Sequence, residues 1–243
     1  MAGHSHWAGI KHKKGRADKE RSKIFSKLSR EITVAAKLGE KDPDMNPRLR
    51  TAIQAAKQAN MPKDNILRAI NKSEIGDNKN YENLRYEGFG PFNTALIIET
   101  LTDNKNRAAS SLRTILQKNG GRLGETGSTK HMFSNCGIIH LDKNKISEEE
   151  IFERSINIGA KDCFLINGVF EIITEKEDFY KIKTELEKDV KNLAYSAVEW
   201  RAYNYIDLNK DQAKKMTEVL TMIEEIDDVQ NIYTNANLKI YNL

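Results

Sequence analysis

Residues 163–174 read CFLINGVFEIIT, two short apolar runs that flank the pair Asn167-Gly168. An Asn-Gly pair between two such runs favours a two-residue turn, because both turn residues adopt positive φ and the turn's twist matches that of antiparallel strands. The stretch therefore predicts a β-hairpin. The segments on either side of it indicate the fold to which the hairpin belongs.

The segment before the hairpin has the pattern of a strand followed by a helix. Residues 136–142, CGIIHLD, form an apolar run typical of a strand. Ser147 and Glu150 have the spacing of a capping box, in which each side chain binds a backbone N–H of the other residue. This spacing predicts a helix over residues 148–158, ended by Gly159.

The segment after the hairpin has the opposite order, a helix followed by a strand. Thr174 and Glu177 again have capping-box spacing and predict a second helix. Its apolar positions are Phe179, Ile182 and Leu186. The strand-like run YSAVEWRAY follows at residues 195–203. The order β-α-β-β-α-β is that of a ferredoxin-like unit, which we predict over residues 134–205.

Residues 81–102, YENLRYEGFGPFNTALIIETLT, indicate another hairpin upstream of this unit. Gly88, Gly90 and Pro91 are its turn residues. A helix is expected from about Asn106 to Lys118, with its apolar side inward. This strand-then-helix order indicates an α+β domain.

The C-terminal segment supplies too little structure to stand alone. Residues 210–226 predict one helix, and VQNIY at residues 229–233 predicts one short strand. One helix and one strand cannot bury a core. We therefore expect residues 79–133 and 206–243 to form one discontinuous α+β domain, with the ferredoxin-like domain inserted into it.

Residues 1–78 predict a basic, all-helical domain with an N-terminal arm. A helix from Asp18 to Leu38 has apolar residues on one side. A second helix is expected at Pro47, with Asn46 as N-cap. A third short helix is expected to bury Ile66, Leu67 and Ile70. The polar run SEIGDNKN then reads as a linker, so the predicted fold class is multidomain α+β.

Composition narrows the classes of protein to consider. The 243 residues are long enough for two or three domains with their own cores. The sequence contains no apolar run of membrane-spanning length and no secretory leader pattern, so we expect a cytoplasmic protein. The two cysteines, Cys136 and Cys163, are too few for a disulfide framework and fall in apolar strands, which indicates core positions.

Positive charge is concentrated at the N-terminal end. Residues 1–72 contain 17 Lys and Arg against 7 Asp and Glu, whereas residues 73–243 contain 22 against 28. On the first helix, basic residues gather opposite the apolar side. They are Lys19, Lys23, Lys27, Arg30 and Lys37. A solvated helix face is the alternative, but clustering of one sign of charge favours contact with nucleic acid.

The arm GHSHWAGIKHKKGR combines one aromatic residue with many cations. Its candidate binding residues are His4, His6, Trp7, Lys11, His12, Lys13, Lys14 and Arg16. A disordered tail is the alternative interpretation. We favour a segment that becomes ordered on RNA or DNA, with Trp7 stacking on a base.

Other candidate sites are weaker. Ala2-Gly3-His4 is a Cu(II)- or Ni(II)-binding terminus if Met1 is removed, although such termini also arise by chance. The run KNGGRLGETGS offers an anion nest beside Arg122, but a helix end followed by a turn is the simpler interpretation. His131 and His140 lack an evident catalytic partner. We therefore expect no catalytic residue, no cofactor and no metal.

Several motifs carry a family resemblance along nearly the whole chain. They are AGHSHWAGIKHKKGRADKERSKIFSKLSREI, YEGFGP, TDNKNR, GGRLGETGS and DDVQNIYTN, in this order. In these motifs the chain resembles the YebC/PmpR family. The resemblance implies three domains: a helical one, a discontinuous α+β one and an inserted ferredoxin-like one. It differs after the Pro91 turn, where many members have glycines and this chain has Phe92 and Asn93.

The family resemblance also implies a function. Members are described as cytosolic regulators that bind promoter DNA, and others, including a mitochondrial translational activator of a cytochrome oxidase subunit, act on ribosomes. None is known as an enzyme. The basic arm and first helix are the presumed nucleic-acid surface, at His4, Trp7, Lys11, Lys13, Lys14, Arg16, Lys19, Arg21 and Lys23 here. Because the motif starts at residue 2, the chain resembles the bacterial form.

We therefore expect a non-enzymatic regulator of gene expression that binds nucleic acid through residues 1–72. Promoter DNA and ribosomal or transfer RNA are alternative targets. Lysine-rich phosphate contact without an evident base-reading set favours structured RNA, whereas the family description favours DNA. A protein partner is expected at the acidic α+β domains.

Overall fold

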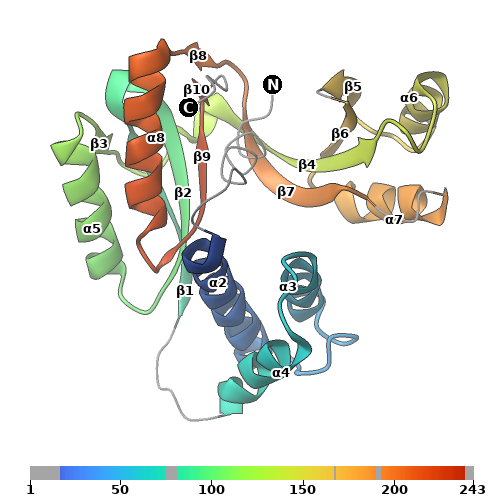
Figure 1. Cartoon of the computed structure of the whole chain (residues 1–243), viewed down its shortest axis with the longest axis horizontal. Helices are drawn as coiled ribbons and strands as arrows, with labels where there is room; N and C mark the ends of the chain where they lie inside the picture. Colours follow the sequence, from blue (N-terminus) through green and yellow to red (C-terminus); the bar gives the residue numbers. More distant parts are fainter. Residues whose placement is uncertain (1–16, 75–80, 167, 190–192, 239–243) are drawn as a thin grey trace.

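The structure is a computed structural model, and it describes residues 17–74, 81–166, 168–189 and 193–238. Figure 1 shows a helical unit at the bottom, a sheet covered by two helices at the left, and a second α+β unit at the right. The predicted fold class is confirmed: an N-terminal helical domain, a discontinuous α+β domain and an inserted ferredoxin-like domain. None of the described helices is both long and apolar enough to cross a bilayer.

The N-terminal unit is built from three helices and a short 3₁₀ turn. They are α2 (Ala17–Leu38), α3 (Pro47–Gln58), α4 (Lys63–Asn71) and η1 (Lys72–Glu74). The apolar side of α2 packs against the other two helices. The buried side chains at this contact include Ile32, Ala35, Leu49, Ala56 and Ile66. The prediction that Leu67 is buried is wrong: it is 46% exposed, because on α4 the inward positions are Ile66 and Ala69.

Asn46 joins two helices of this unit through both ends of its amide. Its Oδ1 accepts the N–H of Leu49 at 3.0 Å, which confirms the predicted N-cap of α3. Its Nδ2 donates to the carbonyls of Ala35 at 2.9 Å and Glu40 at 2.7 Å, at the C-terminal end of α2. Asn46 is 7% exposed, so these bonds fix the angle between α2 and α3 away from water.

The second unit contains a sheet in the order β3-β1-β2-β9. Its strands are β1 (Glu82–Phe89), β2 (Ala95–Thr102), β3 (Arg122–Leu123) and β9 (Val229–Thr234), and each neighbouring pair is antiparallel. The central strand β2 pairs with β1 from the same hairpin and with β9 from the C-terminal segment. This pairing is the reason that the domain is discontinuous in sequence.

Two helices cover one face of this sheet. They are α5 (Lys105–Lys118) and α8 (Lys210–Glu224). The core beneath them contains Leu96 and Ile98 of β2 with Leu112, Leu116, Met216, Leu220 and Ile223 of the helices. On the far face, Ala95 and Ile97 pack with Phe133, Trp200 and Tyr233, where the inserted domain begins and ends.

The turn between β1 and β2 keeps a backbone that glycine favours. Phe92 has φ 61° and Asn93 has φ 58°, both in the left-handed region. These are the two positions where the family resemblance indicates glycines. The turn closes with Gly90 N–H on Thr94 O at 2.7 Å. Phe92 and Asn93 thus adopt a left-handed backbone without being glycines.

The inserted unit has the ferredoxin-like order of strands, β5-β6-β4-β7. Its elements are β4 (Phe133–Asp142), α6 (Glu148–Asn157), β5 (Asp162–Ile166), β6 (Val169–Glu175), α7 (Phe179–Asp189) and β7 (Tyr195–Ala202). Side chains of α6 and α7 share one core with β4 and β6. The β5–β6 hairpin forms as predicted, although Asn167 of its turn lies outside the described residues.

The two predicted capping boxes had different outcomes. Ser147 caps α6, and its hydroxyl accepts the N–H of Glu150 at 3.3 Å. The prediction for Thr174 is wrong, because this residue is a buried part of β6 and its hydroxyl donates to the carbonyl of Glu175. Pairing with β4 extends the strand through Glu175, so α7 begins only at Phe179.

The chain returns from the inserted unit through a small parallel pair, β8 (Ile206–Asp207) with β10 (Ala236–Asn237). We propose domain limits of 1–78 for the helical domain, 79–133 with 206–243 for the discontinuous domain, and 134–205 for the insertion.

We expect Asn46→Ala to destabilise the helical unit by about 2–3 kcal/mol, because it removes a cap and leaves the buried carbonyl of Ala35 and the partly buried one of Glu40 without this donor. Asn46→Asp should also destabilise it, since a carboxylate accepts the Leu49 N–H but cannot donate to the carbonyls. Hydrogen–deuterium exchange of α3 peptides measures the effect. Asn71→Ala, at an exposed position of α4, is the control; equal protection in all variants would contradict the role of Asn46.

Candidate nucleic-acid interface

The structure describes only part of the predicted nucleic-acid surface. Residues His4, His6, Trp7, Lys11, His12, Lys13, Lys14 and Arg16 lie outside the described residues, as does the copper-binding terminus at Ala2-Gly3-His4. Lys19 falls within α2, but its side chain is not described. Lys23, Lys27 and Arg30 of α2 are described.

These last three cations contact an acidic turn of the discontinuous domain. The turn, residues 224–228 with the sequence EEIDD, links α8 to β9 and is called the acidic corner below. Lys23 Nζ lies 2.9 Å from Glu225 Oε1, and Lys27 Nζ donates to the carbonyl of Glu224 at 3.2 Å. The sequence indicated either a solvated face or one that contacts nucleic acid, but at these positions this side of α2 contacts the protein's own acidic corner.

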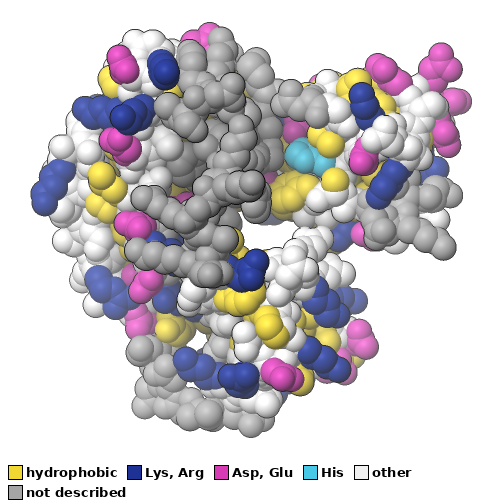
Figure 2. Space-filling view, viewed as in Figure 1, with side chains coloured by type: hydrophobic (Ala, Val, Ile, Leu, Met, Phe, Trp, Pro, Cys, Tyr) yellow, Lys and Arg dark blue, Asp and Glu magenta, His cyan; other side chains and the backbone are white. Residues whose placement is uncertain are grey.

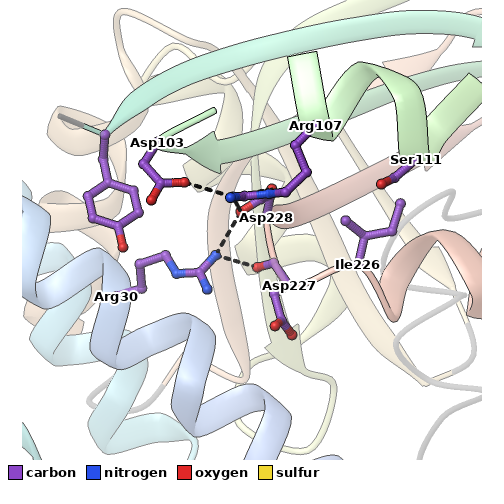
Figure 3. Close-up of a pocket in the computed structure, with 8 residues that line it drawn as sticks. Arg30, Asp103, Arg107, Ser111, Ile226, Asp227 and Asp228 are labelled. Atoms are coloured by element: carbon purple, nitrogen blue, oxygen red, sulfur yellow. Dashed lines mark hydrogen bonds and ion pairs between the residues drawn. The ribbon is translucent and has the colours of Figure 1, made fainter. Parts of the chain in front are cut away.

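Arg30 completes this contact and reaches a nearly buried carboxylate (Figure 3). Its Nη1 donates to the carbonyl of Asp227 at 2.6 Å and lies 3.4 Å from Asp228 Oδ1. Arg107 of α5 approaches the same carboxylate from the other side, with N–O distances of 2.9 to 3.2 Å. Arg107 also binds Asp103 at 2.7 Å.

The burial of Asp228 accounts for this arrangement of charges. It is 4% exposed, and a carboxylate removed from water needs opposite charge and hydrogen bonds to remain ionised. Arg107 supplies most of that compensation. Hydrogen bonds to Asp228 and then to Asp103 raise the pKa of Arg107, so the guanidinium stays protonated.

A basic groove lies on the other flank of α2, between α2 and the α4–η1 segment. The volume of the groove is about 720 Å³. A separate hollow of about 360 Å³ at the acidic corner shares Arg30 and Tyr81 with it. The cations that line the groove are Arg21, Arg30, Lys37, Arg68 and Lys72. No Asp or Glu is among its described lining residues. Figure 2 shows Lys and Arg side chains spread over the helical unit.

The floor of the groove carries hydroxyl groups from one stripe of α2. Ser22, Ser26, Ser29 and Thr33 recur at intervals of three or four residues and face the groove. Hydroxyls and cations together are the groups that proteins use to bind the sugar-phosphate backbone. Our sequence analysis missed this stripe because it followed charge alone. The serine spacing was visible in the sequence.

Two aromatic side chains border the same groove. Phe25 of α2 is partly buried, and Tyr81 stands just before β1. The Arg30 guanidinium lies 5.9 Å from the centre of the Tyr81 ring, within the range of a cation–π contact. Arg30 thus joins the groove to the acidic corner.

The other sequence candidates have structural partners. His140 Nε2 lies 2.8 Å from Glu171 Oε2, so the expectation that His140 lacks a carboxylate partner is wrong. Glu171 also pairs with Arg201. Burial alone would raise the pKa of Glu171, but its bonds with His140 and Arg201 lower it overall. Glu171 of β6 thus joins β4 and β7 through its bonds to His140 and Arg201.

The glycine-rich run after α5 already holds an internal anion. The buried Glu87 Oε2 accepts the N–H groups of Thr129 at 2.9 Å and Lys130 at 2.8 Å, just past the run. Arg122 instead stacks 4.5 Å from the centre of the Phe89 ring. Gly120, with φ 81°, ends α5 as the simpler interpretation predicted.

Cys136 lies in the core as predicted, whereas Cys163 is only partly buried and packs against the core of the inserted unit. Cys136 is buried, and burial raises the pKa of its thiol to about 11. Burial also raises the pKa of Cys163. Both thiols are therefore protonated near neutral pH and are poor nucleophiles.

Comparisons with known proteins cover nearly the whole chain. Residues 5–76 match the family model described as the TACO1/YebC protein N-terminal domain, and residues 81–236 match the TACO1/YebC second and third domain. A probable transcriptional regulatory protein of Pelagibacter ubique is 56% identical, over 98% of this chain and 99% of the relative. One from Maricaulis maris is 46% identical, over 98% and 96%.

A solved structure has the same architecture. The crystal structure of a conserved hypothetical protein, Aq1575 from Aquifex aeolicus, superposes with a TM-score of 0.80 at 40% identity. The match covers 95% of this chain and 96% of that one.

We expect Arg107→Gln to destabilise the chain by about 1–3 kcal/mol and Arg30→Gln by less than about 1 kcal/mol. The reason is that Arg107 makes most of the bonds to buried Asp228, whereas Arg30 makes one long one. Hydrogen–deuterium exchange of β9 measures the difference, with Arg113→Gln on the exposed side of α5 as control. A larger effect at Arg30 would contradict this division of roles.

Proposed function

This chain belongs to the TACO1/YebC family, and on that premise we propose that it is a regulator of gene expression that grips nucleic acid through its N-terminal domain. The observation that carries the proposal is the groove between α2 and α4, lined by five cations and a hydroxyl stripe without a described carboxylate. The relatives' names, probable transcriptional regulatory proteins, support the regulatory role.

The composition of the groove supports phosphate as the ligand. Its guanidinium groups from Arg21 and Arg68 and the ammonium of Lys72 are exposed at the rim. Arginine offers forked donors that match phosphate oxygens, and serine hydroxyls add shorter contacts at the floor. A groove of this kind holds a backbone in register without reading a base sequence. The arm, including Trp7, is proposed to extend the grip beyond the groove.

Promoter DNA is the target that the relatives' names favour. Those names concern transcription, and in this chain duplex binding would use the groove together with the arm. Lys23, Lys27 and Arg30 then add phosphate contacts when they are available.

Structured RNA on the ribosome is the second candidate, and the shape of the groove favours it. Proteins that read duplex DNA usually insert a projecting helix or strand pair into the major groove. Here the cations line a concave surface between two helices, and Phe25 and Tyr81 border it. A concave basic surface with aromatic residues suits an unpaired strand, whose bases stack on aromatic rings.

We propose no catalytic role and a cytoplasmic location. The candidate residues bind and position, since the His, Cys and Glu side chains described above serve ion pairs, loop closure or the core. The acidic α+β domains are proposed to contact a protein partner.

We expect the double variant Arg68→Glu/Lys72→Glu to weaken nucleic-acid binding by about ten- to hundredfold at 0.1 M salt. It should also reduce the slope of log affinity against log salt by about 1.8 for duplex or about 1.4 for a single strand. Fluorescence anisotropy with a labelled 20-bp duplex and a labelled 20-nucleotide RNA measures both. The matched control is Lys118→Glu/Lys214→Glu, the same charge change at exposed positions of α5 and α8.

An equal loss in the control pair would mean that net charge, not the groove, determines binding.

We expect Ser26→Ala/Ser29→Ala to weaken binding by about three- to tenfold while leaving the salt slope unchanged, because hydroxyls bind phosphate without releasing counterions. The same anisotropy titration, repeated at several salt concentrations, tests this. An unchanged affinity would remove the hydroxyl stripe from the site.

Experiments in cells distinguish the DNA target from the RNA target. Lysate is sedimented through sucrose at moderate salt, and DNA crosslinked to the protein is sequenced. Co-migration of the wild type with ribosomes, lost in Arg68→Glu/Lys72→Glu, supports the RNA target. Defined promoter fragments that disappear in the same variant support the DNA target. Neither result would refute the proposed function.

A further inference from the structure

We propose that the acidic corner is an intramolecular competitor for nucleic acid: it occupies Lys23, Lys27 and Arg30 of α2 in the free protein and is displaced when phosphates bind there. The proposal rests on the proposed function. It adds that binding releases the helical domain from the discontinuous domain, so that occupancy of α2 is coupled to the arrangement of the two domains.

The contact places carboxylates and carbonyls where phosphate oxygens would bind. Lys23 meets the Glu225 carboxylate, and Lys27 meets the carbonyl of Glu224. Arg30 meets the carbonyl of Asp227 and the carboxylate of Asp228. These three cations follow one side of α2 over two turns, and the corner runs beside them. Figure 1 shows the α8–β9 turn lying against α2.

The Lys23–Glu225 ion pair across this contact is of a kind that separates easily. The Lys23 side chain is 36% exposed and that of Glu225 is 54% exposed. Exposed ion pairs are individually weak and are screened by salt. Hydrogen bonds and an ion pair join α2 to the corner, whereas each domain buries an apolar core of its own.

Separation of the two domains would take Arg30 away from Asp228, a nearly buried carboxylate that needs opposite charge. If Arg30 were its only partner, opening would leave a nearly buried carboxylate without compensation. Arg107 holds both oxygens of Asp228 from within the same domain, and Leu101 N–H binds the Asp228 carbonyl at 2.8 Å. Arg30 can therefore leave while Asp228 stays paired. The two domains can therefore separate at this contact without unfolding of the acidic corner.

Arg30 also couples the basic groove to the contact with the acidic corner. It lines the basic groove, lies over Tyr81 and binds the corner. A phosphate in the groove offers Arg30 a charge-assisted bond that replaces those to Asp227 and Asp228. Binding in the groove and release of the corner are then linked through one side chain, and each favours the other.

The first test is a pair of variants with the same change in charge. Glu225→Gln removes a carboxylate that binds α2. Asp227→Asn removes one from the same corner whose side chain points away from Arg30 in Figure 3 and whose contact with Arg30 is through the backbone. We expect Glu225→Gln to tighten binding of a labelled 20-nucleotide RNA or 20-bp duplex by about two- to fivefold relative to Asp227→Asn. Equal affinities would overturn the proposal.

The second test measures the distance between the domains directly. Spin labels at Gln58→Cys on the helical unit and Gln117→Cys on α5 occupy exposed, uncharged positions. A Cys163→Ser background suffices, because Cys136 is 1% exposed. We expect a single narrow distance distribution in the full-length free protein and a shift to a longer, broader distribution with saturating nucleic acid. An unchanged distribution would overturn the proposal.

The outcomes separate this inference from the proposed function. If Arg68→Glu/Lys72→Glu abolishes binding while both tests above are negative, nucleic-acid binding stands and the competition fails. If no variant and no wild-type protein binds either probe, both fail. Tighter binding in Glu225→Gln together with a longer distance on binding supports both.

Discussion

A carboxylate that is almost removed from water cannot be left without opposite charge, and Asp228 imposes this requirement at the start of β9. Its position follows from the sheet, because β9 pairs with β2 and so brings the end of α8 against α5. Arg107 satisfies the requirement from within the domain, and Arg30 extends the same cluster to α2. Arg30, together with Lys23 and Lys27, thus holds the helical domain beside a buried charge that Arg107 already compensates.

Local chemistry made much of the fold predictable. The Asn-Gly hairpin, the Asn46 cap with Pro47 behind it, and the glycines that end α5 and α6 each act within a few residues, so their effects appear in the sequence. The insertion was predictable for a different reason. The C-terminal helix and strand cannot form a core alone, so they had to pack on the domain that begins before the ferredoxin-like unit. Thr174 shows the limit. Its spacing suited a cap, but pairing of β6 with β4 kept it in a strand. Such tertiary pairing has no local signature.

The positive charge of the candidate site was predictable from the sequence, but the groove was not. The basic N-terminal segment was evident, yet the periodicity of α2 could not reveal that Lys23, Lys27 and Arg30 face the acidic corner, about two hundred residues away in sequence. Nor could it show that Arg68 and Lys72 stand opposite the serine stripe, since a groove exists only once two helices pack. Residue types are properties of the sequence, whereas surfaces depend on the three-dimensional arrangement of elements.

The discontinuous sheet also has a consequence for synthesis. Ala95 N–H binds the side chain of Asn235, 140 residues later, and β9 follows the whole inserted domain. At about 5–20 residues per second, a ribosome needs about 7–28 s to supply that partner. Meanwhile the apolar strand β2 emerges with one edge unpaired, where another nascent chain can pair with it. The inserted domain completes its own core during this interval, so the C-terminal segment 206–243 determines when the exposed edge is closed.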